Sequence, residues 1–292
     1  KVLEDVILKM VHHIYDKTKM KNLCIGGGVA LNGVANYKIL SEGPFENIHI
    51  PPSPGDAGSA VGAAQYLHYV YHKNTKKISN NSQLIQENVY VGPSYTNEEI
   101  KSFLDSKNIP YESFNDITLL EKTAQLIADG NVVGWYQGKM EWGPRALGNR
   151  SILADPRRAD MKDILNAKIK HRESFRPFAP SIMEEFASEY FEMDIPSPYM
   201  LMVAPVKKPK EIPAVTHVDG TGRLQTVSKE SNELYYSLIN EFYKITGVPV
   251  IINTSMNVMG EPIVNTPEQA YSMILKTDMD YIVMGNNIIK RD

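Results

Sequence analysis

Apolar residues at the start of the chain, KVLEDVILKMVHHIYDKTK, recur at intervals of three and four, and this spacing predicts an amphipathic helix over 1–19. Its apolar positions are Val2, Leu3, Ile7, Leu8, Val11 and Ile14. An α/β domain normally opens on a strand, and here neither a strand nor a Met precedes the helix. We therefore expect the chain to begin inside a larger domain.

Strand and helix patterns alternate after this helix. A short strand, a glycine turn and a helix precede a second short strand at 45–50. The next helix is rich in small residues over 57–64, which suits close packing against a sheet. A polar stretch over 73–88 is the predicted linker. This organisation predicts a first domain over 1–72 and a second over 89–292.

The second domain shows the same alternation over a longer stretch. Strands are predicted at 88–95, 110–114, 131–138, 199–206, 223–228, 248–255 and 280–289. Helices are predicted at 97–107, 117–129, 231–246 and 266–276. Alternating elements with a few returning strands predict an α/β fold with a mixed, twisted sheet.

Composition narrows the class of protein. With 42% hydrophobic and 22% charged residues, the chain is typical of a globular protein. No apolar run reaches the length of a membrane span, and the first helix lacks the features of a signal peptide, so we expect a cytoplasmic protein without a membrane partner. The single cysteine, Cys24, excludes an intramolecular disulfide, and its place in LCIGGG predicts a buried small side chain.

Charge is concentrated in one region. Ten Lys or Arg and five acids lie between Lys139 and Arg176, in a chain of net charge −3. Six of these cations are arginines, whose planar fork suits bidentate capture of phosphate or carboxylate: Arg145, Arg150, Arg157, Arg158, Arg172 and Arg176. The region therefore predicts a site for a phosphorylated anion.

Two other interpretations apply to parts of this region. Lys162, Lys168 and Lys170 alternate with acids at helical spacing, so we expect them on a solvated helix face. Nucleic-acid binding usually comes with a basic domain, whereas this chain has a pI near 6.2. The segment EWGPRALGNRS fits neither interpretation, because its glycines let backbone N–H groups approach an anion.

Two glycine-rich turns in the first domain are further candidates. GGGVALNG lies between a strand and a helix, where free N–H groups can cradle a phosphate, although the pattern by itself slightly favours a tight packing turn. SPGDAG places Asp56 at the start of the next helix, where it can cap the helix or bind a metal.

Two segments of the second domain offer polar side chains next to strands. VTHVDGTGRLQTV carries His217, Asp219 and Arg223 around two glycines, and either a binding site or a solvated hairpin accounts for it. INTSMNVMGEPIVNT carries Asn253 and neighbouring polar residues at the carboxyl end of a strand, where open α/β sheets bind ligands.

The blocks CIGGGVALNGVANYKI, NIHIPPSPGDAGSAVGAA, GKMEWGPRALGNRSILADPR, FRPFAPSI, HVDGTGRLQTV and INTSMNVMGEPIV occur in this order. With these blocks the chain resembles, over nearly its whole length, the O-carbamoyltransferases of nodulation and antibiotic biosynthesis. In that family a metal-containing domain of actin/Hsp70-like ATPase fold precedes a YrdC-like domain. The resemblance implies that this chain holds the end of the first domain and all of the second.

The resemblance also implies an activity. The YrdC-like domain would join ATP and carbamoyl phosphate into carbamoyl-adenylate, and the first domain would pass the carbamoyl group to a hydroxyl of a small-molecule acceptor such as a sugar, an antibiotic or a Nod factor. We expect this chain alone to carry out only part of that reaction. Its oligomeric state, including a homo-oligomer, stays open.

Site residues follow from the family's motifs. The implied catalytic residues are Lys139, Arg145, Arg150, His217 and Arg223, and the implied substrate-binding residues are Ser151, Arg176 and Asn253. The implied nucleotide-binding residues are Gly27, Gly28 and Asn32. Asp56 matches an acid that binds a divalent metal, Fe or Mg, but the two histidines of that site fall upstream in the family. His12 and His13 are not their equivalents, so the resemblance implies an incomplete metal site here.

Two alternatives belong to other classes. YrdC-like domains also occur in tRNA modification, so an RNA-binding or tRNA-modifying module is one alternative, against which the single basic cluster counts. A regulatory nucleotide-binding domain without turnover is the other.

Overall fold

The structure, a computed structural model, describes residues 1–75 and 89–291, which fall into two units. Unit 1 contains Lys1–Val89, Trp142–Pro144 and Met200–Val203, and unit 2 contains Tyr90–Glu141, Arg145–Tyr199 and Ala204–Asp292. From residue 76 onward the predicted linker lies outside the described residues. No helix in the described ranges is both long and apolar enough to cross a membrane.

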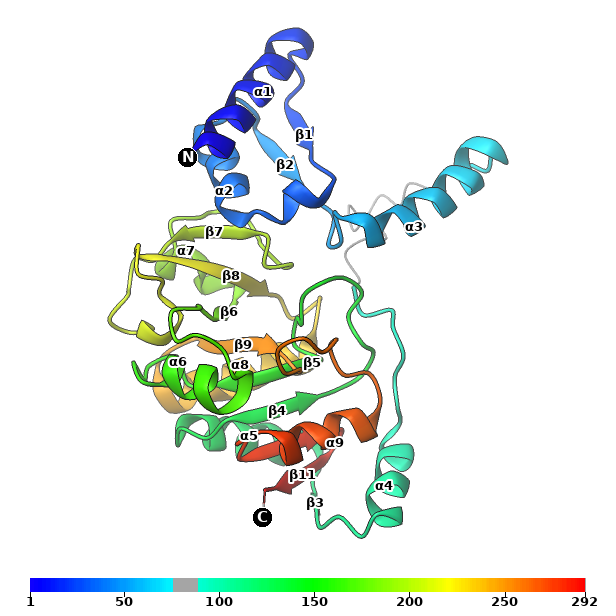
Figure 1. Ribbon diagram of the computed structural model, residues 1–292, viewed down its shortest axis with the longest axis vertical. Helices are drawn as coiled ribbons and strands as arrows, with labels where there is room; N and C mark the ends of the chain where they lie inside the picture. The colour runs from blue at the N-terminus through cyan, green and yellow to red at the C-terminus, as the bar shows by residue number, and fades with distance from the viewer. Residues whose placement is uncertain (76–88, 292) are drawn as a thin grey trace. The chain divides into compact units, whose positions relative to one another are not determined.

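Unit 1 is a small α/β unit. Its elements are α1 (Val2–Thr18), β1 (Asn22–Cys24), η1 (Gly28–Leu31), α2 (Gly33–Glu42), β2 (Asn47–His49), α3 (Asp56–Gln65) and η2 (Tyr66–Tyr71). Strands β1 and β2 pair in parallel, with Leu23 opposite Ile48. The amphipathic pattern of α1 buries Val11, which packs with Leu23 of β1, Ile39 of α2 and Phe45. Figure 1 shows α1 and α2 beside the two strands.

Two expectations for unit 1 are wrong. Cys24 is exposed rather than buried, because alternation along β1 places Leu23 in the core and Cys24 on the opposite face. Helix α3, expected to pack closely on a sheet, has no buried residue. None of its small side chains is buried in the described chain, so a helix rich in small residues is not by itself evidence of close packing on a sheet.

Unit 2 holds most of the chain. Its helices are α4 (Asn97–Ser106), α5 (Asp116–Ala128), α6 (Met161–Ile164), η3 (Leu165–Lys170), η4 (Glu184–Phe186), α7 (Ala187–Tyr190), η5 (Pro213–Val215), α8 (Glu233–Thr246) and α9 (Pro267–Lys276). Several begin at side-chain caps: Thr96, Asn115, Asn232 and Thr266 each accept a hydrogen bond from a backbone N–H of the first turn.

Apart from β1 and β2, the strands of the described chain form one sheet of nine, in the order β3-β11-β10-β4-β5-β9-β6-β8-β7. They are β3 (Glu112–Ser113), β4 (Val133–Tyr136), β5 (Arg150–Ala154), β6 (Ala179–Met183), β7 (Met202–Pro205), β8 (Thr221–Val227), β9 (Val250–Ser255), β10 (Tyr281–Met284) and β11 (Asn287–Lys290). The β10–β4 and β6–β8 pairs are parallel, whereas β4–β5, β5–β9 and β6–β9 are antiparallel. The expected α/β fold with a mixed sheet is confirmed.

One face of the sheet is covered by α5 and α8. Their apolar faces, including Leu119 and Phe242, pack on alternate residues of the central strands, such as Val133 and Trp135 of β4. The next residue of β4, Tyr136, points to the other face, where its hydroxyl donates to the carbonyl oxygen of Asn265, just before α9. In Figure 1, α9 is drawn just below β4. The loop between β4 and β5 therefore begins at a strand that is packed on both faces.

Candidate anion-binding site

The loop between β4 and β5 folds around the carboxylate of Glu141. This side chain is 6% exposed, and its Oε1 accepts hydrogen bonds from the backbone nitrogens of Leu147, Asn149 and Arg150 at 2.7, 2.7 and 3.2 Å. Burial raises the pKa of Glu141, and the backbone donors oppose that rise. An acid thus occupies the concave run of N–H groups, and it fixes the loop before any ligand binds.

Gly148 and Ser151 complete the turn. Gly148 has φ +109°, and a Cβ on it would lie 2.3 Å from a ring carbon of Tyr235. Its backbone nitrogen donates to the Ser151 hydroxyl at 3.0 Å. The glycine is therefore required both by its backbone conformation and by the ring that lies against it. Ser151, an implied substrate-binding residue, is fully buried and holds this turn.

Arg150 is bound by the chain itself. It has no exposed surface, and its guanidinium donates to the carbonyl oxygens of Gln137, Gly138, Pro93 and Asn149 at 2.5 to 3.2 Å. It also stacks 3.9 Å from the ring centroid of Tyr136. Burial lowers the pKa of Arg150, against the opposing effects of Tyr136 and Glu141. These contacts give Arg150 a part in holding the loop.

A polar network below the loop contains Asn253. Its Nδ2 donates to the Ala146 carbonyl oxygen at 3.2 Å and to Gln225 Oε1 at 2.9 Å, and Gln225 Nε2 donates to the Leu147 carbonyl oxygen at 2.9 Å. Ser181 joins through its hydroxyl, 2.7 Å from Gln225 Oε1. Side chains from β9, β8 and β6 thus fix the backbone carbonyl groups of Ala146 and Leu147, the two residues that follow Arg145. Gln225 and Ser181 were not predicted from the sequence. A polar residue within a buried strand was the signal that could have indicated them.

Arg145 and Arg223 carry charges that no acid in the described chain neutralises. Neither guanidinium has a hydrogen-bond or carboxylate partner there, and both Nε atoms are closed to solvent. Burial, together with the charges of Arg145 and Arg172, lowers the pKa of Arg223 to about 9. Burial also lowers the pKa of Arg145. Two guanidiniums without a counter-charge, one of which lowers the pKa of the other, form a site for an anion.

Arg172 extends this site from the segment that follows η3. Its Nε donates to Asn166 Oδ1 at 2.7 Å, and its guanidinium lies 4.8 Å from the ring centroid of Phe178. Burial lowers the pKa of Arg172, and the charge of Arg176 adds to that effect. We name Arg145, Arg172 and Arg223 the arginine cluster.

The expectation that Lys170 lies on the surface is wrong. Its side chain is enclosed because η3 turns this position toward β9, where Nζ donates to the carbonyl oxygens of Ser255 and Asn257 at 2.5 and 2.9 Å and to Asn257 Oδ1 at 3.0 Å. Burial and the charge of Arg172 together lower the pKa of Lys170 to about 7.

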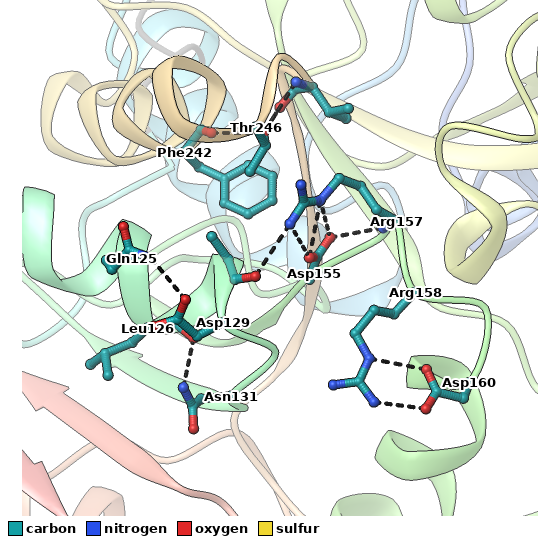
Figure 2. Close-up of polar contacts among 12 residues, drawn as sticks. Gln125, Leu126, Asp129, Asn131, Asp155, Arg157, Arg158, Asp160, Phe242 and Thr246 are labelled. Atoms are coloured by element: carbon teal, nitrogen blue, oxygen red, sulfur yellow. Dashed lines mark hydrogen bonds and ion pairs between the residues drawn. The ribbon is translucent and has the colours of Figure 1, made fainter.

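Other cations of the basic region are paired with acids. Figure 2 shows Arg157 turned to Asp155 and Arg158 turned to Asp160, with guanidinium–carboxylate distances of 2.6 and 2.7 Å. Arg176 is exposed and pairs with Glu173 at 2.9 Å. The exposed Lys139 follows β4 at the start of the loop. The arginines of the basic region therefore fall into three groups: those paired with acids, Arg150 bound by backbone carbonyl groups, and Arg145 and Arg172 of the arginine cluster.

His217 lies at the edge of the site. With Lys162, Phe175, Pro177, Thr216, Val218 and Asp219 it lines an open pocket of about 340 Å³. Its Nδ1 is 3.0 Å from the Thr221 hydroxyl, and its Nε2 is closed to solvent without a partner in the described residues. Burial lowers the pKa of His217, and so do the charges of Arg223 and Lys162, against an opposing effect of Asp219. His217 is thus electrostatically linked to the arginine cluster.

Implied nucleotide and metal residues all lie in unit 1. Gly27 and Gly28 are exposed, and Asn32 caps α2 by accepting from the Ala35 nitrogen at 3.1 Å. Asp56 is exposed at the first position of α3. Residues 1–75 and 89–291 contain no group of three His, Cys, Asp or Glu side chains that could hold a metal. The residues present do not fit a metal centre by themselves.

Two families of known proteins match this chain, one in each of its two parts. The family described as Carbamoyltransferase C-terminus matches residues 124–291, and the family described as Carbamoyltransferase N-terminus matches residues 1–65. The chain belongs to the carbamoyltransferase family. The C-terminal match contains every residue of the arginine cluster together with His217 and Asn253.

Relatives of this carbamoyltransferase chain are longer. It is 45% identical to an uncharacterized Synechocystis protein, 44% to nodulation protein NolNO of Sinorhizobium fredii and 42% to nodulation protein NolO of Bradyrhizobium diazoefficiens. Each match covers 99% of this chain and 51%, 42% and 53% of the relative, respectively. The chain thus spans about half the length of the curated relatives it matches.

Among solved structures, full-length HypF in its phosphate- and nucleotide-bound form is 18% identical, with a TM-score of 0.41 over 63% of this chain and 23% of HypF. Sua5 of P. abyssi is 14% identical, with a TM-score of 0.41 over 59% of this chain and 50% of Sua5.

Proposed function

We propose that this chain is part of an ATP-dependent O-carbamoyltransferase and that unit 2 forms carbamoyl-adenylate from carbamoyl phosphate and ATP. The observation that carries this proposal is the arginine cluster. Arg145 and Arg223 are half-buried cations without a protein counter-charge in the described residues, and the carbamoyltransferase family would supply phosphorylated substrates that provide one. A desolvated site strengthens such charge pairs.

The chemistry requires two anions close together. Loss of phosphate from carbamoyl phosphate with water leaves carbamate, and a carbamate oxygen then attacks the α-phosphorus of ATP while pyrophosphate leaves. Negative charge repels the attacking oxygen from the triphosphate, so the arginine cluster would hold both partners and stabilise the charge that develops on the phosphorus oxygens. Glu141, Arg150 and Ser151 would keep the loop in the shape that presents Arg145.

Lys139 and Arg176 would act from outside the buried site. Both are exposed, so they can meet a ligand that extends from the arginine cluster toward solvent. Asn253 would act through its buried network, in which its Nδ2 donates to Ala146 and Gln225.

Carbamoyl transfer to a hydroxyl would need more than the described chain offers. Gly27, Gly28 and Asn32 could contribute to a nucleotide turn, and Asp56 could contribute one metal ligand, but unit 1 has no complete metal centre in its described residues. We therefore expect the 292-residue chain to form carbamoyl-adenylate without carbamoylating an alcohol.

The test is an exchange assay. The chain is incubated with ATP, labelled pyrophosphate and carbamoyl phosphate, and label should enter ATP only when carbamoyl phosphate is present. Mass spectrometry of the quenched reaction should show carbamoyl-adenylate. The Arg145→Ala variant should lose exchange, whereas Arg158→Ala, at an arginine paired on the surface, should retain it.

Two outcomes would contradict the proposal. Absence of carbamoyl-phosphate-dependent exchange would remove adenylate formation from unit 2. A tRNA gel shift that weakens steeply with salt, together with no exchange, would instead favour the RNA-binding alternative.

A further inference from the structure

The tautomer of His217 is fixed by its neighbours. Asp219 Oδ1 accepts from the Thr221 hydroxyl at 2.7 Å and from the Thr221 backbone nitrogen at 3.1 Å. The Thr221 hydroxyl has one proton and gives it to Asp219, so the hydroxyl oxygen can only accept from the His217 ring, 3.0 Å away. The proton of the neutral imidazole therefore sits on Nδ1.

This assignment leaves Nε2 as a hydrogen-bond acceptor. The atom is closed to solvent and has no donor in the described residues. Since burial and the neighbouring cations lower the pKa of His217, the ring stays neutral at pH 7 and Nε2 keeps its lone pair. A buried acceptor without a donor is costly, and a ligand N–H that reached it would remove that cost.

Surroundings of the ring identify the ligand. Arg223 is close enough to affect His217 electrostatically, and it belongs to the arginine cluster that would hold a phosphoryl group. Carbamoyl phosphate carries an amino group one carbonyl away from its phosphoryl ester oxygen, whereas the amino group of adenine lies at the far end of ATP. A short ligand held by Arg223 thus brings a carbamoyl N–H to His217.

We propose that His217 Nε2 accepts a hydrogen bond from the carbamoyl amino group and so selects carbamoyl phosphate over acyl phosphates that lack an N–H. The inference rests on the proposed function, since it assigns part of the same site. Phe175 and Val218, which line the pocket with His217, are 71% and 97% exposed, so few contacts oppose their displacement when a ligand enters.

A matched pair of stable analogues tests this role. Phosphonoacetamide carries the amide N–H₂, and acetonylphosphonate replaces it with a methyl group of similar size. Calorimetry on the full chain should show that the amide binds about tenfold or more tightly, because a site built to accept an N–H disfavours an analogue without one. In His217→Leu the ratio of the two affinities should fall to about one. His13→Leu, at an exposed histidine of α1, should leave the ratio unchanged.

The tautomer gives a second readout that does not depend on activity. Nitrogen-15 NMR of the histidines should place the His217 proton on Nδ1 in the wild-type chain. Thr221→Val removes the acceptor of that proton and should shift the spectrum toward the other tautomer, with a smaller preference for the amide. A wild-type spectrum with the proton on Nε2 would overturn the proposal.

The remaining outcomes separate this inference from the proposed function. Equal affinity of the wild-type chain for both analogues would exclude the hydrogen bond between the carbamoyl amino group and His217 but would not contradict the anion site. If neither analogue binds, the arginine cluster is not an anion-binding site, and the proposed function is contradicted. If His217→Leu instead loses a preference for ATP over purine riboside triphosphate, which lacks the adenine amino group, then Nε2 meets adenine and the carbamoyl assignment is wrong.

Discussion

The ammonium of Lys170 lies 2.9 Å from the carbonyl oxygen of Asn257 and 3.0 Å from its side-chain oxygen. Lys170 thereby ties the end of η3 to the turn after β9. Its bonding partners in the described chain are all neutral oxygens, so the cost of burying its charge is not offset by an acid.

This arrangement predicts a pH dependence of stability. The pKa of Lys170 is about 7 in the folded chain, against about 10.4 for a lysine in an unfolded chain. Between these values the unfolded chain binds more protons, so the free energy of unfolding should rise with pH. From pH 7 to 9, Lys170 should contribute up to about 1.4 kcal/mol per pH unit.

Urea denaturation at pH 7, 8 and 9 measures this slope. Lys170→Met should reduce it, whereas Lys168→Met, at an exposed lysine of the same helix, should not. Equal slopes in the wild-type chain and Lys170→Met would show that Lys170 does not titrate in this range.

Arg145→Ala should separate binding from stability. The guanidinium has no hydrogen-bond partner in the described residues, and it repels Arg223, so the melting temperature should stay the same or rise. Affinity for phosphonoacetamide should fall roughly 10- to 100-fold, as expected for loss of a charge-assisted hydrogen bond. Calorimetry and thermal denaturation of Arg145→Ala and Arg158→Ala measure both effects. Unchanged affinity in Arg145→Ala would exclude it from the site.

Glu141→Ala should have the opposite profile. It leaves the buried nitrogens of Leu147 and Asn149 without their acceptor, which should lower the free energy of unfolding by about 2–4 kcal/mol. Glu141→Gln keeps an acceptor oxygen and should lower it by only about 1 kcal/mol. Denaturant titration distinguishes the two variants. A loss below 0.5 kcal/mol in Glu141→Ala, roughly the level of a surface substitution, would mean that the loop keeps its shape without the carboxylate.

Asp56 should bind no metal tightly in this chain. A single exposed carboxylate offers too few ligands for a strong transition-metal site. Elemental analysis of the purified chain should find less than stoichiometric Fe and Zn, with the same content in Asp56→Ala. A stoichiometric metal that disappears in Asp56→Ala would refute this.

Long, strongly periodic elements could be predicted from the sequence. The helices expected at 231–246 and 266–276 are α8 and α9, with starts shifted by one or two residues. The single strand expected at 280–289 is a hairpin, β10 and β11, because Gly285 has φ +54° and reverses the chain. Strands β5 and β6 were missed, since β5 begins with Arg150 and β6 contains Pro180, residues that are unusual in a central strand.

The site could be predicted only in part. The sequence pointed to Arg145, Arg223 and His217 as side chains near glycine-rich turns. It could not tell them from Arg157 and Arg158, whose acids lie two positions away in the chain, because only the fold shows which cations lack a partner. Glu141 was missed because an acid inside a basic region looks like an ordinary surface charge until the loop closes around it.

The close approach of Gly148 to the ring of Tyr235 limits which amino acids position 148 can carry. A side chain at position 148 would collide with a ring that is itself fully buried in α8. In a library that samples every substitution, position 148 should therefore tolerate fewer replacements than the exposed Lys139, although glycine has no side chain that could touch a ligand. Variants of α8 that move Tyr235 could in turn admit alanine at 148, so the two positions should change together in chains selected for activity.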